Sequence, residues 1–275
     1  MRIKIRTSKW AIWARRLGSI AVPLVVLPVL MHRERFIESG IFLVLILFAG
    51  AVAALTILIS LVALARLWYS GDQGWARALA GLCLGLLCLS PFLYYGALAL
   101  RYPPATDIAT IERGALPLLF EPDTALMPPA RLVSLAEQAR YFPNATTRDY
   151  PLDVIQLFAL VDRIVRANGW DIHRRSEPLA FGEQGRINAR IVTLPGWREE
   201  AVLLVRPTRG GARVDMRSAS IGAPIDFGSN GNRISAFMVA LDNEVTAFLR
   251  DNPNINEPAA VDEEPSPEVE TGNGG

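Results

Sequence analysis

The stretch "DMRSASIGAPIDFGSNGNRI", residues 215–234, joins the end of a strand to the start of a helix through a polar loop. Its first residues continue the alternation of apolar Val214 and Met216 with charged neighbours, which is typical of a half-buried strand. From Ile234 onward the apolar residues recur at helical spacing. A strand that turns directly into an amphipathic helix places the helix against its sheet, so the stretch predicts a two-layer α+β domain.

The elements before and after this stretch complete the predicted domain, residues 151–250. An amphipathic helix begins at Pro151 and stops at Gly169. Strand-like segments follow at 170–176 ("WDIHRRS"), at 186–193 ("RINARIVT") and at 199–220, the last of which forms a hairpin that turns at residues 209–211. A second amphipathic helix covers 233–249. We therefore expect an antiparallel sheet packed by two helices.

Three apolar runs come before the domain, at Leu17–Met31, Ile41–Ala65 and Ala78–Leu100. The second and third are long enough to cross a hydrocarbon core as helices, and the first is shorter and contains Pro23 and Pro28. The mean hydropathy of +0.25 is too high for an ordinary soluble domain. Residues 17–100 are thus predicted to form a three-helix membrane region that contacts the lipid bilayer.

The distribution of basic residues predicts the orientation. Residues 1–16 carry six basic side chains and no acidic one, and the loop 66–77 carries two more. Basic segments stay in the cytoplasm, so both belong on that side. Three crossings then place everything after Leu100 in the periplasm of a bacterial inner membrane. If the first run does not cross, the domain becomes cytoplasmic instead.

Two further segments flank the domain. Residues 101–150 are rich in proline and predict an extended linker, with one short helix near 131–140. Residues 251–275 are acidic, with several prolines and a glycine-rich end, which predicts a disordered tail. The two cysteines, Cys83 and Cys88, lie five positions apart on a predicted helix and cannot form a disulfide bond with each other.

Several kinds of site are disfavoured by the residues present. The loop "GSNGNR" lacks the glycine spacing of a nucleotide loop, and a net charge of +1 gives no case for nucleic acid. His173 has no histidine or cysteine near it, so we expect neither a metal nor a cofactor. A hydrolase would need Ser218 or Ser220 with His173 as base, but no G-x-S-x-G motif is present, and we assign no catalytic residue.

The polar residues around the loop are the remaining candidates for ligand binding: Arg217, Ser218, Ser220, Asp226, Asn230 and Arg233. The alternation also puts Arg186, Asn188 and Arg190 on one face with Arg213, Asp215 and Arg217, which would either hold anions or simply meet water. Within the loop we expect Arg217 to pair with Asp226. We also expect Asn230 or Asn232 to cap the second helix, and Gly228 to hold a special backbone shape.

Residues 214–242, "VDMRSASIGAPIDFGSNGNRISAFMVALD", resemble the signature of domain-of-unknown-function family 1499, DUF1499. In that family a D-x-R-S-x-S strand leads through D-x-G-x-N to R-I and a helix. The segments "RLWYSGDQGWARALAG" (66–81), "DIAT" (107–110) and "YPLD" (150–153) resemble its membrane-bound members. The resemblance covers roughly residues 60–245 and implies a domain in an envelope setting, without an established activity.

Together these features predict an inner-membrane protein that presents a non-catalytic binding or scaffolding domain to the periplasm. Its expected partners are the lipid bilayer and an envelope lipid or protein. The alternative is a membrane-anchored hydrolase that uses Ser218 or Ser220 with His173. The sequence leaves the oligomeric state open.

Overall fold

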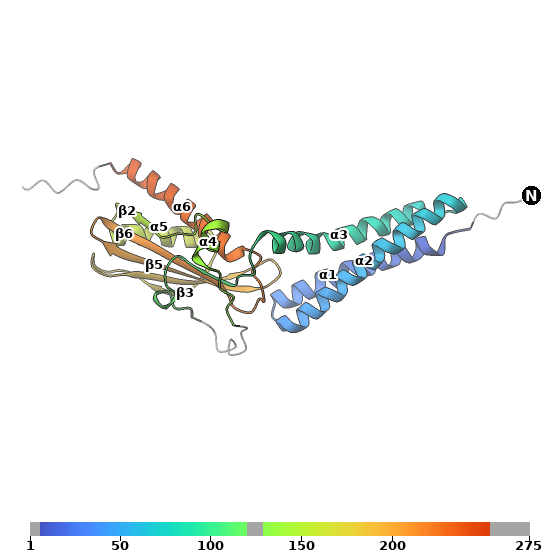
Figure 1. The fold of residues 1–275 in the computed structure, drawn as a ribbon, viewed down its shortest axis with the longest axis horizontal. Helices are drawn as coiled ribbons and strands as arrows, with labels where there is room; N and C mark the ends of the chain where they lie inside the picture. The colour runs from blue at the N-terminus through green and yellow to red at the C-terminus, as the bar shows by residue number, and fades with distance from the viewer. Residues whose placement is uncertain (1–5, 120–128, 254–275) are drawn as a thin grey trace, which may run out of the picture.

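The computed structural model describes residues 6–119 and 129–253. The molecule is elongated, with a bundle of three helices at one end and an α+β domain at the other (Figure 1). The domain lies at the end of the bundle farthest from the N-terminus. Nearly all of the tail predicted to be disordered, from residue 254 onward, lies outside the described residues.

The bundle consists of α1 (Lys9–Arg33), α2 (Ser39–Ser70) and α3 (Trp75–Arg101). All three are long and apolar enough to cross a membrane, so the prediction of three long apolar helices is confirmed. α1 continues unbroken through Pro23 and Pro28 and begins eight residues before the predicted apolar run. At 25 residues it is long enough to span a bilayer despite its prolines.

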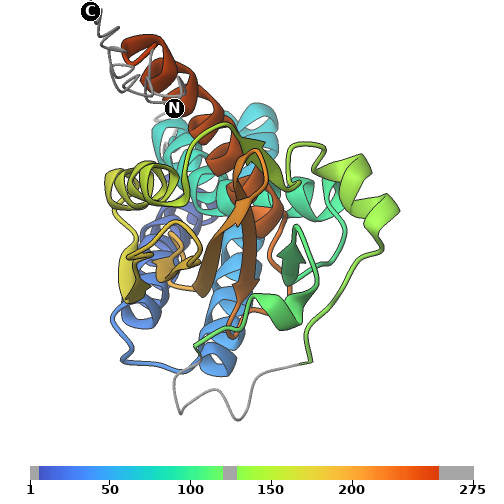
Figure 2. The same cartoon turned by 90° about the vertical axis from the view of Figure 1, so that its left-hand side faces the viewer.

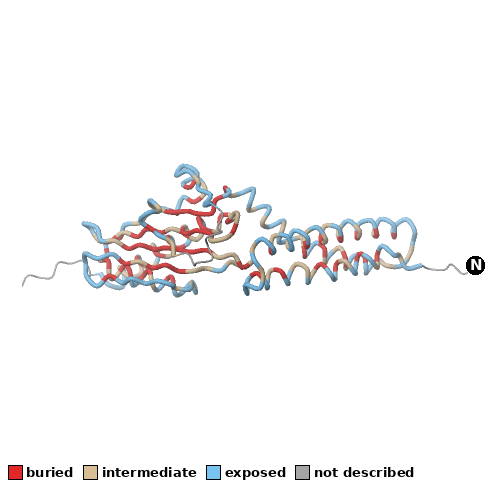
Figure 3. The backbone as a smooth tube through the Cα atoms, turned by 90° about the horizontal axis from the view of Figure 1, so that it is seen from below, coloured by how far each residue is buried: buried red, intermediate tan, exposed pale blue. Residues whose placement is uncertain are grey.

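Small side chains let the three helices approach closely. A Cβ added at Gly81 would lie 2.6 Å from the backbone carbonyl group of Ala14 on α1, and one at Gly85 would lie 2.8 Å from the side chain of Ile57 on α2. The buried inner faces of the helices are lined mainly by small residues, whereas the outer faces are exposed (Figure 3). The buried alanines are Ala11, Ala14, Ala21, Ala49, Ala53, Ala63 and Ala78. Such packing is characteristic of helices that associate in lipid, where apolar burial alone gives little driving force.

The domain is built on a six-stranded antiparallel sheet with the order β1-β6-β5-β4-β3, in which β2 also pairs with β6. The strands are β1 (Asp107–Ala109), β2 (Arg148–Tyr150), β3 (Asp171–Ser176), β4 (Gly185–Val192), β5 (Arg198–Thr208) and β6 (Gly211–Ser220). The helices are α4 (Leu135–Tyr141), α5 (Val154–Ala167) and α6 (Ser229–Asp251), with a 3-10 turn, η1, at Arg113–Ala115. The predicted α+β class is confirmed.

The hydrophobic core lies between one face of the sheet and the helices α5 and α6. The strands contribute alternate residues to this core, for example Ile187, Leu203 and Met216. The helices contribute Phe158 and Phe237. In Figure 1 α6 lies above the strands, and in both Figure 1 and Figure 2 residues 110–119 run below them. The sheet is thus covered on both faces.

The segment 101–150 takes part in the sheet. It contributes β1 and β2, which pair with opposite ends of β6: Asp107 lies opposite Ala219, and Tyr150 lies opposite Ala212. Each of these strands is only three residues long, too short for alternation to be recognised in the sequence. The predicted short helix near 131–140 is present as α4, whose Ser134 and Glu137 form a reciprocal capping box.

Polar and aromatic contacts join the domain to the bundle. At the end of α1, His32 donates from Nδ1 to the carbonyl oxygen of Pro195, 2.7 Å away, in the turn between β4 and β5. The imidazole of His32 stacks on Phe42 with ring centroids 4.3 Å apart, and Trp197 packs edge-on against both rings. Arg33 also donates to the carbonyl of Thr193. The domain is therefore fixed to the α1–α2 connection as well as to the end of α3.

Replacing Gly81 by alanine should destabilise the bundle by about 1–3 kcal/mol, because the added methyl group meets the backbone of α1. At Gly96 on the same helix, no atom lies within 4 Å of the position that a Cβ would occupy, so Gly96→Ala should be neutral or slightly stabilising. Thermal unfolding of the detergent-solubilised protein measures both. Equal midpoints for the two variants would contradict the close packing of α1 and α3.

Candidate functional site

Five of the six candidate binding residues converge at one end of the core face. Ser218 and Ser220 point from β6 to the helix side of the sheet, in phase with Met216. Asn230 and Arg233 lie on the first turns of α6, and Asp226 lies in the loop just before it. We call this set, together with Glu199 of β5, the buried polar cluster.

The side chain of Asn230 is at the centre of the buried polar cluster and is 0% exposed. Its amide nitrogen donates to Oγ of Ser220 at 3.0 Å, to Oδ2 of Asp226 at 2.9 Å and to the carbonyl oxygen of Thr106 at 3.2 Å. Its amide oxygen accepts from the hydroxyl of Ser218 at 2.7 Å. One side chain thus connects α6, β6 and the segment that leads into β1.

An ion pair between Glu199 and Arg233 closes the cluster. The side chain of Glu199 is 2% exposed and that of Arg233 is 13% exposed. Glu199 also accepts from the hydroxyls of Ser220 and Ser229, and Arg233 also donates to Oγ of Ser218 at 2.8 Å. Because both charges are largely removed from water, loss of either partner would leave an uncompensated charge inside the domain, which typically costs about 3–5 kcal/mol.

The first turn of α6 is held by Asp226. Its Oδ1 accepts from the backbone N–H of Gly228 at 2.8 Å, and its Oδ2 accepts from that of Asn230 at 3.3 Å. The expectation that Asn230 or Asn232 caps the helix is wrong, because α6 begins at Ser229 and both asparagines already lie inside it. The carboxylate of Asp226 therefore caps the helix, a role that the sequence pattern suggested for the side-chain amide of Asn230 or Asn232.

Gly228 has the special backbone shape that the sequence predicts. Its φ angle is +82°, a left-handed conformation that side chains disfavour. A Cβ at this position would also lie 2.5 Å from the ring of Tyr102, which stacks on Phe142. The glycine is required for two reasons, backbone conformation and close approach.

The predicted pairing of Arg217 with Asp226 is also wrong. Arg217 is directed to the other face of the sheet, where its Nε and Nη2 donate to the two carboxylate oxygens of Asp107 at 3.0 and 2.7 Å. Alternation along β6 explains the difference, since Arg217 and Ser218 must face opposite sides and Asp226 lies on the side of Ser218. Arg113 lies 3.2 Å from the same carboxylate, which is 2% exposed.

The second face of the sheet is covered by residues 110–119. Arg217 and Arg186 donate to the carbonyl oxygens of Leu116 and Ala115, and Asn188 donates to that of Pro117, at 2.9, 3.2 and 3.1 Å. Leu116 is buried there against Val202 and Leu204. Around Arg186, Asn188 and Arg217 this face is therefore not an open anion groove, because residues 115–117 cover it, whereas Arg213 on the same face is exposed.

The structure does not bring together the residues of the alternative hydrolase. Ser218 is 0% exposed and its hydroxyl is bound to Asn230 and Arg233. His173 lies on β3, separated from β6 by β4 and β5, and its ring is 3.2 Å from Asp171. Three strand spacings amount to roughly 14 Å, well beyond hydrogen-bond reach. Within residues 6–119 and 129–253, no group of histidine, cysteine or acidic side chains is arranged to hold a metal ion.

Two acidic residues that bind the candidate arginines, Glu199 and Asp107, were not among the candidates expected from the sequence. Glu199 is in phase with Ala201 and Leu203 on β5, so an acidic side chain at a core position was a detectable signal. Asp107 gave no such signal, because β1 is too short for a pattern. All six candidate residues bond to groups within the domain, and none of their side-chain atoms is left buried without a partner.

Comparison with known proteins identifies one family. Residues 131–241 match the family model described as "Protein of unknown function (DUF1499)". The match runs from just before α4 into α6, and it confirms the resemblance seen in the sequence over this part of the domain. No curated protein and no solved structure matches the chain.

Arg217→Ala should destabilise the domain by about 3 kcal/mol, because it removes the bidentate partner of the buried Asp107 carboxylate. Asp107→Ala should cost a similar amount and the double variant little more, since both changes remove one interaction. A double-mutant cycle by urea unfolding of the solubilised protein measures this. The exposed pair Arg213–Asp149, bidentate and also involving β6, is the matched control and should show a much smaller coupling energy. Additive energies for Arg217 and Asp107 would contradict the pairing.

Asp226 should make stability depend on pH between about 4 and 6. Burial, followed by the nearby charge of Glu199, raises its pKa from 3.8 to about 6. The folded protein then binds more protons than the unfolded chain in this window, so stability falls as pH rises through it, by about 3 kcal/mol in total. Asp226→Asn should lose this slope, whatever its absolute stability.

Unfolding midpoints of both proteins at several pH values test the assignment. Asp149→Asn is the control: Arg213 lowers the pKa of Asp149, so its contribution is lost only below about pH 4 and the slope from 4 to 6 should persist. An Asp226→Asn variant with the same pH profile as the unmodified protein would refute the assignment.

Proposed function

We propose that the protein is a membrane-anchored, non-catalytic module. In this proposal three spans hold the α+β domain against the periplasmic surface of a bacterial inner membrane, where the domain binds or scaffolds an envelope component. The observation that carries it is the junction formed by His32, Phe42 and Trp197, which fixes the domain on the end of the bundle. A domain held in this way presents one set of surfaces at a constant height above the membrane.

The state of the polar residues supports a non-catalytic role. Catalytic acids, bases and nucleophiles must reach a substrate, and they lie in clefts with at least one bonding position open. Here the buried polar cluster satisfies itself internally, and Arg217 is engaged by Asp107. The signature residues are therefore better explained as the means by which the domain stays folded and attached than as a reaction centre.

The surface proposed for binding lies at the far end of the domain. The loop between β3 and β4 exposes Leu179 and Phe181, with 83% and 71% of their surface accessible. Leu179 donates its backbone N–H to Glu183, 2.9 Å away, which orients the loop. β4 starts at this loop and ends next to the turn that contacts α1, so the loop lies at the end of the sheet away from the bundle. Exposed apolar residues grouped in this way are typical of interaction sites.

A photoreactive amino acid at position 181, introduced in living cells, tests the binding role. We expect a discrete adduct with an envelope protein or lipid, and we expect Leu179→Ser to reduce its yield. The same probe at the exposed Leu87 of α3 is the control and should label bulk lipid only. If position 181 gave no adduct, or only the pattern of position 87, the proposed binding surface would be wrong.

Fusions to alkaline phosphatase test the orientation. The enzyme is active only outside the cytoplasm, so a fusion after Arg101 should be active and a fusion after Gly74 inactive. The physical basis is the concentration of basic residues in segments 1–16 and 66–77, which favours their retention in the cytoplasm. Activity after Gly74 and not after Arg101 would show the reverse orientation and place the domain in the cytoplasm.

A further inference from the structure

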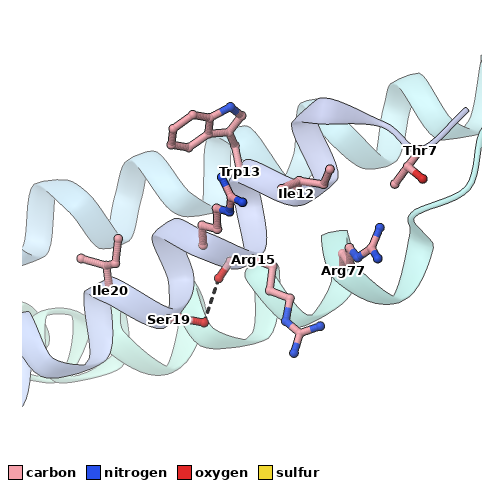
Figure 4. A pocket seen from close by; sticks show the side chains of 8 residues that line it. Thr7, Ile12, Trp13, Arg15, Ser19, Ile20 and Arg77 are labelled. Carbon is pink, nitrogen blue, oxygen red and sulfur yellow. Dashed lines mark hydrogen bonds between the residues drawn. The ribbon is translucent and has the colours of Figure 1, made fainter.

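A groove lies between α1 and α3 at the end of the bundle that carries the N-terminus (Figure 4). It has a volume of about 740 Å³. Its walls combine cationic and apolar side chains, among them Ile12, Trp13, Arg15, Ser19, Ile20 and Arg77. The groove lies at the end of the bundle opposite the domain and has no part in the function proposed above.

The charge of the groove is strongly positive. Arg15, Arg16 and Arg77 line it, and no acidic side chain does. Within the described chain, none of the three forms an ion pair, and Arg16 instead lies over the ring of Trp13 at 5.8 Å. Three neighbouring guanidinium groups repel one another, so an anion in the groove would relieve this repulsion.

The relative position of the two helices is fixed at this end. Thr7 forms a parallel bridge with Gln73, with backbone hydrogen bonds on both sides, so the segment before α1 is paired to the segment before α3. Gly81 brings α3 against Ala14 of α1. Arg15 of α1 and Arg77 of α3 therefore both line the groove, one from each helix.

In a bilayer the groove would lie at the depth of the lipid headgroups. Arg15 is six residues into α1, about 9 Å along its axis. Four tryptophans surround this end of the bundle, and all are partly or largely exposed: Trp10, Trp13, Trp68 and Trp75. Tryptophan is enriched where the hydrocarbon core meets the headgroups. Ile20, 52% exposed, continues the groove toward the hydrocarbon core.

We propose that this groove binds one anionic glycerophospholipid through its phosphate. The guanidinium groups of Arg15 and Arg77 would donate to the phosphate oxygens, since arginine matches phosphate geometry in a bidentate manner. Arg16 adds charge at the rim, and Ile12, Trp13 and Ile20 contact the glycerol and the first part of an acyl chain. Basic pockets between spanning helices are suited to such headgroups because the lipid supplies both the charge and the apolar contact.

The test uses the full chain in nanodiscs that contain equal amounts of phosphatidylglycerol and phosphatidylcholine with identical acyl chains. After extraction into mild detergent, native mass spectrometry measures which lipid remains bound. We expect the unmodified protein to retain phosphatidylglycerol in clear excess. Arg15→Gln combined with Arg77→Gln should reduce that excess about tenfold, since each arginine contributes to anionic lipid binding.

The matched control removes two positive charges outside the groove, at the same end of the bundle. Lys9→Gln combined with Arg66→Gln leaves the groove intact, since neither residue lines it and Arg66 lies over the ring of Trp10 on another surface. This variant should keep the preference for phosphatidylglycerol. If it lost the preference to the same extent, the attraction would be a general property of the surface and the groove would not be a site.

Two further arms decide the identity of the ligand without depending on the glutamine variants. Inorganic phosphate added during extraction should not displace the retained phosphatidylglycerol, because it lacks the apolar part; displacement at equal concentration would point to a free-phosphate site instead. Equal retention of the two lipids by the unmodified protein would overturn the proposal outright. Arg15→Lys with Arg77→Lys preserves the charge and should keep part of the preference.

Discussion

The buried amide of Asn230 is the contact on which the rest of the domain depends. It bonds at the same time to β6, to the loop before α6 and to the backbone that leads into β1. A buried amide without hydrogen-bond partners would destabilise the folded state, because its desolvation would not be compensated. This free-energy cost is offset only when all partners are in place. The sheet, α6 and the segment that follows α3 are therefore held in one relative arrangement.

This arrangement gives a physical meaning to the family signature. Ser218, Ser220, Asn230 and Arg233 belong to the buried polar cluster, and Asp226, also a member, holds the first turn of α6. The remaining positions act on the opposite face or in the backbone: Asp215 accepts from Thr147 and Arg206 at 2.6 and 2.5 Å, Arg217 binds Asp107, and Gly228 takes a left-handed shape. In this chain the residues of the signature therefore stabilise the fold and connect its elements.

The parts that could be predicted from the sequence are those that rest on local patterns. Hydropathy identified three helices, and periodicity identified α5, α6 and the strands β3 to β6, because a half-buried element repeats its apolar residues at its own spacing. Partners of buried charges were not predictable in this way. Arg217 was assigned to Asp226 in the loop that follows its strand, whereas its partner Asp107 lies 110 positions away in a three-residue strand. Sequence patterns indicate that a charge needs a partner, but only the topology of the sheet determines which one.

The pairing of β1 and β2 with β6 has a consequence for biosynthesis. Residues 107–109 are synthesised early, but their partners at 217–219 are synthesised only after the other strands of the sheet. Closing so long a loop is slow, because its entropic cost is met before the contacts that reward it can form. During that delay β1 has no strand partner, a state in which strands readily pair with the wrong neighbour. Assembly of the sheet is thus complete only after β6 has been synthesised, and β1 waits longer for its partner than any other strand.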